Sequence, residues 1–271
     1  METRLKQRIE LVNKYFIESP KKPNYIGYYI ALAVFAFLLL AGRGSRGAAA
    51  LLVLIGVVGF LIAAVRLYGR WSVYRKAFNR AEPKATDRQM DDWLQEGKKM
   101  VEAEARRRLD IDNSDVKAGP LWIDGPANGS YIVAGSDRVL RYKQHNILIL
   151  YLTDHQVATF QCILDLGPGE ILGDRTKEFP FKDITNLETS TSKESFYYYK
   201  KEKIVEGIQT FGLYTSGANV IELNFFYSKT DRPADADYIY PPSDADNTIK
   251  AIRKSLKEYK DRSGAGAQKP N

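Results

Sequence analysis

The stretch GAAALLVLIGVVGFLIAAV, residues 47–65, contains no charged residue and determines how the N-terminal part of the chain folds. A helix of this length spans roughly 28 Å, which matches the hydrocarbon core of a bilayer. Its Leu, Val, Ile and Phe side chains together favour membrane insertion by about 3–7 kcal/mol. A helix buried in a soluble protein usually carries polar residues on one face, and this stretch has none. The stretch therefore predicts a transmembrane helix.

A second uncharged stretch, YIGYYIALAVFAFLLLAG at residues 25–42, precedes the first. A cleaved signal peptide is the alternative for it, but its apolar run exceeds the about 7–15 residues of a signal peptide and another span follows at once. Only Arg43-Gly44-Ser45-Arg46 separates the two stretches. We therefore expect a tight antiparallel hairpin over residues 23–69, with no room for the pore helix and filter of a two-span channel.

Lysine and arginine residues around the hairpin predict its orientation. The loop holds two Arg, whereas more cations precede the first span and follow the second; these are Lys14, Lys21, Lys22, Arg66, Arg70, Arg75, Lys76 and Arg80. The positive-inside rule then places both termini of a multi-pass protein in the cytoplasm. The short hairpin favours a bacterial plasma (inner) membrane. Aromatic and basic residues expected at the membrane interface are Arg66, Arg70, Tyr68, Trp71 and Tyr74.

The net charge of +7 is unevenly distributed. Residues 1–80 contain 13 Lys and Arg against 3 Asp and Glu, whereas residues 81–271 contain 27 against 30. The basic segments flank the membrane and suit anionic headgroups. The slightly acidic remainder offers little field for attracting phosphate, so we do not expect a nucleic-acid partner.

Helical patterns flank the hairpin on both sides. Residues 1–22 predict an amphipathic helix that either lies on the bilayer surface or packs on the protein's own juxtamembrane segment; its apolar face comprises Leu5, Ile9, Val12 and Phe16. Residues 70–117 predict juxtamembrane helices. Within them, Thr86-Asp87-Arg88-Gln89 is a capping-box pattern. We expect the helix that follows to dock on the soluble domain or on the membrane surface.

Residues 118–262 change to the period of two that is typical of β-strands. Strands are expected at 147–152, 157–164, 186–191, 195–201, 208–214 and 220–226, with a turn at Leu166-Gly-Pro-Gly-Glu170 and a loop at 235–244. A final amphipathic helix over about 245–261 precedes a tail, 263–271, that we expect to be disordered. The fold class is therefore α+β, a transmembrane hairpin followed by an antiparallel β barrel or sheet that a C-terminal helix caps.

Two short motifs in this domain are similar to those of bacterial pleckstrin-homology-like domains. Leu152-Thr-Asp-His-Gln-Val-Ala-Thr-Phe160 resembles the hairpin of that family, and Glu178-Phe-Pro-Phe-Lys-Asp-Ile-Thr-Asn-Leu-Glu188 resembles its step into a strand. The resemblance covers residues 119–262, although the region of Trp122 and the stretch before Ile147 do not match. It implies a binding or oligomerising module that is not an enzyme.

The residues that could carry chemistry form no catalytic, metal or cofactor motif. His145 and His155 lie ten apart, and neither they nor Asp154 have the spacing of a metal site. We interpret His155 as a polar turn residue and Cys162 as a small core side chain. Three basic residues are candidates for binding a lipid headgroup, with a solvated strand face as the alternative; they are Arg138, Arg141 and Lys143.

These observations rank three functions. The first is a membrane-anchored, non-catalytic interaction module whose cytoplasmic domain binds a protein or anionic lipid headgroups as an adaptor. The second is a self-associating hairpin, because Gly27/Ala31 and Gly59/Ala63 have the spacing of close-packed membrane helices, with the domain controlling assembly. The third is an enzyme acting on a membrane substrate, which would need Asp154, His155 and a second carboxylate in one cleft.

Overall fold

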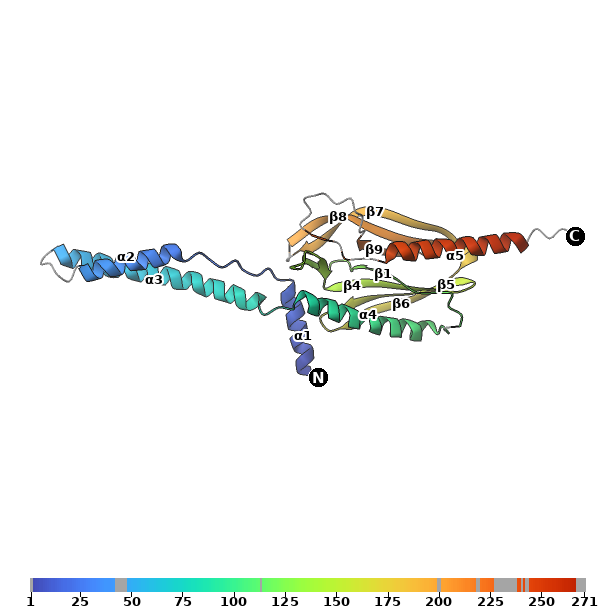
Figure 1. Cartoon of the computed structure of the whole chain (residues 1–271), viewed down its shortest axis with the longest axis horizontal. Helices are drawn as coiled ribbons and strands as arrows, with labels where there is room; N and C mark the ends of the chain where they lie inside the picture. Colours follow the sequence, from blue (N-terminus) through green and yellow to red (C-terminus); the bar gives the residue numbers. More distant parts are fainter. Residues whose placement is uncertain are drawn as a thin grey trace. The chain divides into compact units, whose positions relative to one another are not determined.

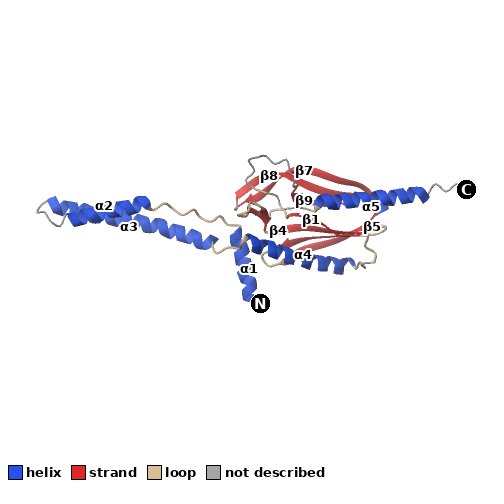
Figure 2. Ribbon diagram, in the orientation of Figure 1, coloured by secondary structure: helices blue, strands red, loops and turns tan. Residues whose placement is uncertain are grey.

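The computed structural model describes residues 2–41, 48–112, 114–198, 201–217, 220–226, 238–239, 241 and 244–266. The chain divides into two compact units, one formed by residues 17–83 and the other by residues 1–16 together with 84–271. The described elements combine helices with mostly antiparallel sheets and a C-terminal helix, so the predicted α+β class is confirmed (Figure 2).

The unit of residues 17–83 consists of two helices that pack along each other, α2 (Ile26–Ala41) and α3 (Ala48–Ala81). Among the described residues, α3 alone is long and apolar enough to cross a membrane, since the apolar part of α2 is shorter. With 34 residues, α3 extends about 51 Å. One helix therefore contains both the expected second span and residues 70–81. The expected Arg43–Arg46 loop lies outside the described residues.

The other unit contains two sheets. The first has the strand order β1-β4-β5-β6 and the second β3-β2-β7-β8-β9. Their strands are β1 (Ala118–Pro126), β2 (Tyr131–Ala134), β3 (Leu140–Tyr142), β4 (Gln144–Leu152), β5 (Gln156–Asp165), β6 (Glu170–Pro180), β7 (Ile184–Tyr198), β8 (Lys201–Thr215) and β9 (Val220–Phe226). All pairings are antiparallel except that of β2 with β7, which is parallel.

Several expectations need correction. In the described part of the chain the strands form two separate sheets and no closed barrel. The strand expected at 186–191 and residues 195–198 of the one expected at 195–201 belong to a single strand, β7, whereas 199–200 lie outside the described residues and Lys201 begins β8. The pairing of β7 with β8 shifts register between Ser192 and Lys193, so this point is a bulge and not a strand end. The sequence also missed β1, β2, β3 and β6. The Leu166–Glu170 turn and the strands β4, β5, β8 and β9 were predicted.

Strand β4 is buried on both faces, and each face builds a different core. Leu148, Leu150 and Leu152 point to the second sheet, where they meet Phe211, Phe225 and other apolar side chains. Ile147, Ile149 and Tyr151 point the other way, to the helices that cover the outer face of the first sheet (Figure 1). A near-continuous apolar run is the pattern of such doubly buried strands.

Helix α4 (Asp87–Leu109) covers the outer face of the first sheet. Its buried residues follow the helical period, which confirms that it docks on the soluble domain; they are Met90, Gly97, Val101, Ala105 and Leu109. A Cβ on Gly97 would overlap the side chain of Leu164, so this glycine permits the close approach of helix and sheet. Thr86 caps the helix with both hydrogen bonds of the predicted capping box.

Helix α1 (Glu2–Tyr15) also packs on this domain. Val12 and Phe16 are 0% and 3% exposed and join the core beneath α4, which disagrees with a helix lying on the bilayer. The amphipathic pattern of residues 1–22 thus packs on the protein itself. Helix α5 (Ala245–Gly266) contributes Ile249 and Ile252 to the core between the sheets. Residues 263–266, expected in a disordered tail, are helical, while 267–271 and most of the expected 235–244 loop lie outside the described residues.

Candidate functional site

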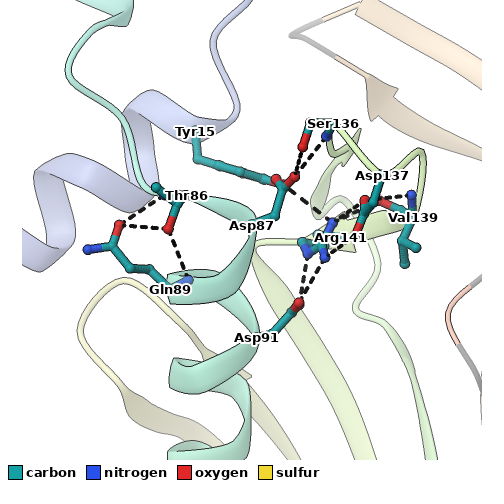
Figure 3. Close-up of polar contacts among 9 residues, drawn as sticks. All are labelled: Tyr15, Thr86, Asp87, Gln89, Asp91, Ser136, Asp137, Val139 and Arg141. Atoms are coloured by element: carbon teal, nitrogen blue, oxygen red, sulfur yellow. Dashed lines mark hydrogen bonds and ion pairs between the residues drawn. The ribbon is translucent and has the colours of Figure 1, made fainter.

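The start of α4 and the β2–β3 region meet at a charged cluster built around Arg141 (Figure 3). Arg141 lies in β3 and is 8% exposed. Its Nε and Nη2 donate to the two oxygens of Asp91 at 2.8 Å each, and its Nη1 and Nη2 donate to Asp137 at 2.9 and 2.7 Å. Nη1 also donates to the carbonyl of Val139. All five N–H donors of a guanidinium are therefore engaged within the protein.

Asp87 extends this cluster to α1 and to the β2–β3 loop. Asp87 and Asp91 are four residues apart, so the helical period places both carboxylates on the face of α4 that meets Arg141. Tyr15 donates its hydroxyl to Asp87 at 2.6 Å, and Ser136 donates its backbone N–H at 2.8 Å (Figure 3). The first turn of α4 thereby joins α1 to the β2–β3 loop.

The pKa values of these groups follow from the pairing. The hydrogen bonds from Arg141 lower the pKa of Asp137 to about 2. Partial burial opposes ionisation of Asp87, but hydrogen bonds from Ser136 and Tyr15 outweigh it and hold the pKa of Asp87 below its ordinary value. Burial raises the pKa of Tyr15, as does its hydrogen bond to Asp87. Asp87, Asp137 and Arg141 are therefore charged at neutral pH, and their ion pairs and hydrogen bonds connect α4 to the β2–β3 region.

A second polar cluster is formed by His145 of β4, Asp124 of β1 and Lys98 of α4. His145 is 3% exposed, and its Nδ1 lies 3.0 Å from Asp124 Oδ1. Lys98 Nζ lies 3.0 Å from the other oxygen, Oδ2. Burial opposes the charge on Asp124, yet the charges of His145 and Lys98 hold its pKa at about 2. Since an ionised carboxylate only accepts hydrogen bonds, Nδ1 of His145 must carry a proton.

The two clusters line one cavity of about 320 Å³ between α4 and the β-sheets. Arg141, Asp91 and Asp137 of the first cluster and His145, Asp124 and Lys98 of the second all line it. Its lining also includes Met90, Leu94, Leu140, Tyr142 and Leu166. The ring of Tyr142 lies 4.4 Å from that of His145, centroid to centroid, and burial raises the pKa of the Tyr142 hydroxyl well above its ordinary value.

The structure separates the three residues expected to bind a headgroup. Arg141 has no N–H left for a ligand, so the prediction fails for this residue, and it is not on a solvated strand face either. Arg138 is exposed in the β2–β3 loop with a positive φ of 66°. Lys143 is partly buried directly after β3. Neither Arg138 nor Lys143 forms an ion pair with any residue that the structure describes.

The expected membrane-interface residues all belong to α3. Arg66, Arg70, Tyr68 and Trp71 are exposed, and Tyr74 is partly buried. The rings of Tyr68 and Trp71 lie 6.1 Å apart. The guanidinium of Arg70 stacks over Tyr28 of α2, 5.3 Å from its ring centroid.

The expected chemical residues do not converge. His155 is exposed in the β4–β5 turn, which confirms its interpretation as a turn residue. Asp154 pairs with Lys117 and, at 3.2 Å, with Arg262. Cys162 is buried in the core as predicted, and burial raises the pKa of its thiol to about 12. Among the described residues no group of His, Cys, Asp and Glu could hold a metal ion.

The pair of His145 and Asp124 is the feature that the sequence did not indicate. The strand that contains Asp124 was not expected, and its register places Asp124 opposite Ile147, close to His145. The only available signal was a histidine at the start of a strongly apolar strand. No protein-family model, curated protein or solved structure matches the chain.

Proposed function

We propose that the chain is a membrane-anchored, non-catalytic interaction module. In this proposal α2 and α3 form a two-span hairpin in a bacterial plasma membrane, both termini lie in the cytoplasm, and a pleckstrin-homology-like domain presents a binding surface beneath the bilayer. The tether raises the concentration of the domain near membrane partners.

The exposed apolar surface of α3 is the observation that carries the proposal. Leu54, Leu61 and Val65 are 63%, 57% and 69% exposed, and most of the described large apolar side chains of the helix share this exposure. Such a contiguous apolar surface marks a membrane or protein contact. The helix is about 51 Å long and the hydrocarbon core about 30 Å thick, so its charged second half reaches beyond the core.

The domain supports a binding role more than a catalytic one. Asp154 pairs with Lys117 and Arg262, and His155 is exposed in a turn, so no described contact favours the enzyme alternative. Arg138 and Lys143 lie on either side of β3 with no ion pair among the described residues. They are the basic side chains of this region with free capacity for an anionic headgroup or an acidic protein surface.

Packing within the hairpin reduces support for the self-assembly alternative. A Cβ on Gly59 would overlap the ring of Phe35 in α2. Ala63 is 7% exposed, and it lines with Gly27 and Ala31 a hollow between the two helices. The small residues thus serve the contact between α2 and α3 of one chain, and a second chain is not needed to explain them.

A chain without the hairpin tests the anchor. The N–H of Ala85 donates to the carbonyl of Leu11 at 3.2 Å, so a Gly/Ser linker of about ten residues, reaching roughly 17 Å, can replace residues 17–83. We expect the full chain in the membrane fraction and the linker chain in the soluble fraction, with a near-ultraviolet circular dichroism signal that shows a folded domain. A soluble full chain, or a linker chain that still sediments with membranes, contradicts the proposal.

A matched pair of double variants tests the surface. Arg138→Gln with Lys143→Gln should weaken cosedimentation of the linker chain with phosphatidylserine vesicles by about tenfold or more. Lys250→Gln with Arg253→Gln makes the same charge change on the exposed face of α5 and should have little effect. If both double variants lose cosedimentation equally, binding depends only on net charge and not on a surface at β3. If the linker chain does not bind the vesicles, the full chain is crosslinked in native membranes. The proposal then requires a defined protein that is recovered with the Lys250/Arg253 double variant and lost with the Arg138/Lys143 double variant. If no such protein is recovered, the module has no binding surface at β3.

A further inference from the structure

A hollow of about 470 Å³ lies between α2 and α3. Most of its wall is apolar, with Ala31 and Phe35 on α2 and Ala63 on α3. Among the described residues that line it, Arg66 alone is charged, and it directly follows the uncharged stretch 47–65. The hollow therefore has an apolar body and one basic end.

The basic end carries more than one hydrogen-bond donor. Arg70 lies one helical turn beyond Arg66, and its guanidinium stacks over the ring of Tyr28, which also lines the hollow. Neither guanidinium forms an ion pair with any residue that the structure describes, and the sequence of residues 23–81 contains no Asp or Glu. Arginine binds phosphate through paired, charge-assisted hydrogen bonds. This end of the hollow therefore favours an anionic group such as a phosphate.

Open space at Gly27 indicates that the two helices do not fill the hollow themselves. A Cβ on Gly59 would overlap the ring of Phe35, whereas a Cβ on Gly27 would have no neighbouring atom within 4 Å. Gly27 lies in the first turn of α2 and lines the hollow. In a bilayer, an empty apolar hollow would forfeit dispersion contacts, and lipid acyl chains are the apolar groups available to fill it.

We propose that the hollow binds one anionic phospholipid of the cytoplasmic leaflet, with an acyl chain between α2 and α3 and the phosphate on Arg66 and Arg70. The volume is within the range of ligand pockets. The negative headgroup matches two cations that no carboxylate of residues 23–81 balances, whereas a zwitterionic headgroup brings its own cation. The inference rests on the proposed function, because only a membrane-spanning hairpin holds the hollow at the depth of acyl chains.

Native mass spectrometry of the full-length chain, released from nanodiscs, measures the retained lipid. The nanodiscs contain equal amounts of dioleoyl phosphatidylglycerol and dioleoyl phosphatidylcholine, which share their acyl chains and differ in headgroup charge. We expect one phosphatidylglycerol per chain, retained about tenfold more often than phosphatidylcholine, because each arginine near the membrane surface favours an anionic lipid by about fivefold.

Two pairs of matched variants locate the site. Arg66→Gln should lower the preference for phosphatidylglycerol about fivefold. Arg75→Gln removes an exposed guanidinium from the same helix outside the hollow and should leave the preference unchanged. Gly27→Leu fills the open space and should remove most of the retained lipid. Gly69→Leu, at a position that also has open space but does not line the hollow, should keep it.

The outcomes separate this inference from the anchor itself. A chain that does not enter the nanodiscs overturns both. If the chain enters them and retains the two lipids equally, or if the two variants of either pair have equal effects, the lipid site is wrong and the anchor stands. Release of a lipid-free dimer means that a second copy fills the hollow, which also overturns the lipid site.

Discussion

Apolar side chains of similar size are placed oppositely in the two units. Phe160 in the domain is 0% exposed, whereas Leu61 and Val65 in α3 are 57% and 69% exposed. The domain therefore gains its stability by removing apolar surface from water. The helices of residues 17–83 gain less in this way, because much of their apolar surface remains uncovered; in the proposed anchor, a bilayer would cover that surface. Apolar side chains therefore stabilise the fold of the domain, whereas many of those in α3 remain exposed.

Truncating one apolar side chain in each unit should give the largest contrast. Phe160→Ala leaves a cavity in the core beneath α4, and we expect it to lower the free energy of unfolding of the domain by about 4 kcal/mol. Leu61→Ala should leave it unchanged. Urea unfolding of the chain in detergent, followed by the fluorescence of Trp93 and Trp122, measures both. If both variants lower the free energy of domain unfolding by similar amounts, apolar side chains of α3 stabilise the domain as much as those of its own core.

The arginines of the two units give a second contrast. Arg141→Met removes a buried cation from three carboxylates, of which Asp91 and Asp137 are 54% and 45% exposed and can be solvated by water; we therefore expect a loss of about 2–3 kcal/mol of domain stability. Arg70→Met removes an exposed guanidinium from the face of Tyr28 and should not change domain unfolding. If Arg141→Met is neutral in the same urea experiment, the cluster does not clamp α4 to the sheet.

The two units also differ in how much their sequence predicts. The helices of residues 17–83 were predicted from composition, because an uncharged apolar run in a bilayer would have to satisfy its backbone hydrogen bonds internally, and a helix does so. Strand β4 and helix α5 follow from strong local patterns. Strand β6 was missed because it is an edge strand with charges on both faces, among them Asp174, Arg175 and Glu178. Such charges protect edges from pairing and also hide the period of two.

The candidate site could not be predicted because its residues come from separate elements. Asp91 and Arg141 are 50 residues apart and meet only because α4 docks on the first sheet. Arg141 was expected on a surface, since an arginine is rarely buried without a partner, and the partners were not visible in its own strand. The resemblance to pleckstrin-homology-like domains stays a prediction. Its motif at 178–188 coincides with the end of β6, a single turn of 3-10 helix at Phe181–Asp183, and the start of β7.

The pH dependence of stability distinguishes the buried carboxylate from an exposed one. The pKa of Asp124 is about 2 in the folded protein and about 3.9 in an unfolded chain. A depressed folded-state pKa stabilises the fold above the unfolded value, so the contribution of about 2.6 kcal/mol is complete above pH ~5 and is lost as the pH falls toward ~1. Asp124→Asn should therefore destabilise the domain at neutral pH and progressively less in acid. Asp154→Asn, at an exposed ion pair, should have a much smaller effect; an Asp124→Asn penalty that is constant with pH would contradict this account.

The smallest expected difference between the units comes from two helix caps that form the same kind of hydrogen bond. Thr86 accepts a hydrogen bond from Gln89 N at 3.2 Å at the start of α4, and Asn24 accepts one from Ile26 N at 2.9 Å at the start of α2. Replacing either by alanine removes one capping bond, which costs about 1 kcal/mol in a helix that depends on it. Thr86→Ala should lower the free energy of domain unfolding by that amount, because α4 covers the first sheet and must be ordered for its core to form. Asn24→Ala should leave domain unfolding unchanged, since no described side chain of α2 belongs to either core. If Asn24→Ala destabilises the domain as much as Thr86→Ala does, the two units unfold together, and the separate energetic treatment of anchor and domain is wrong.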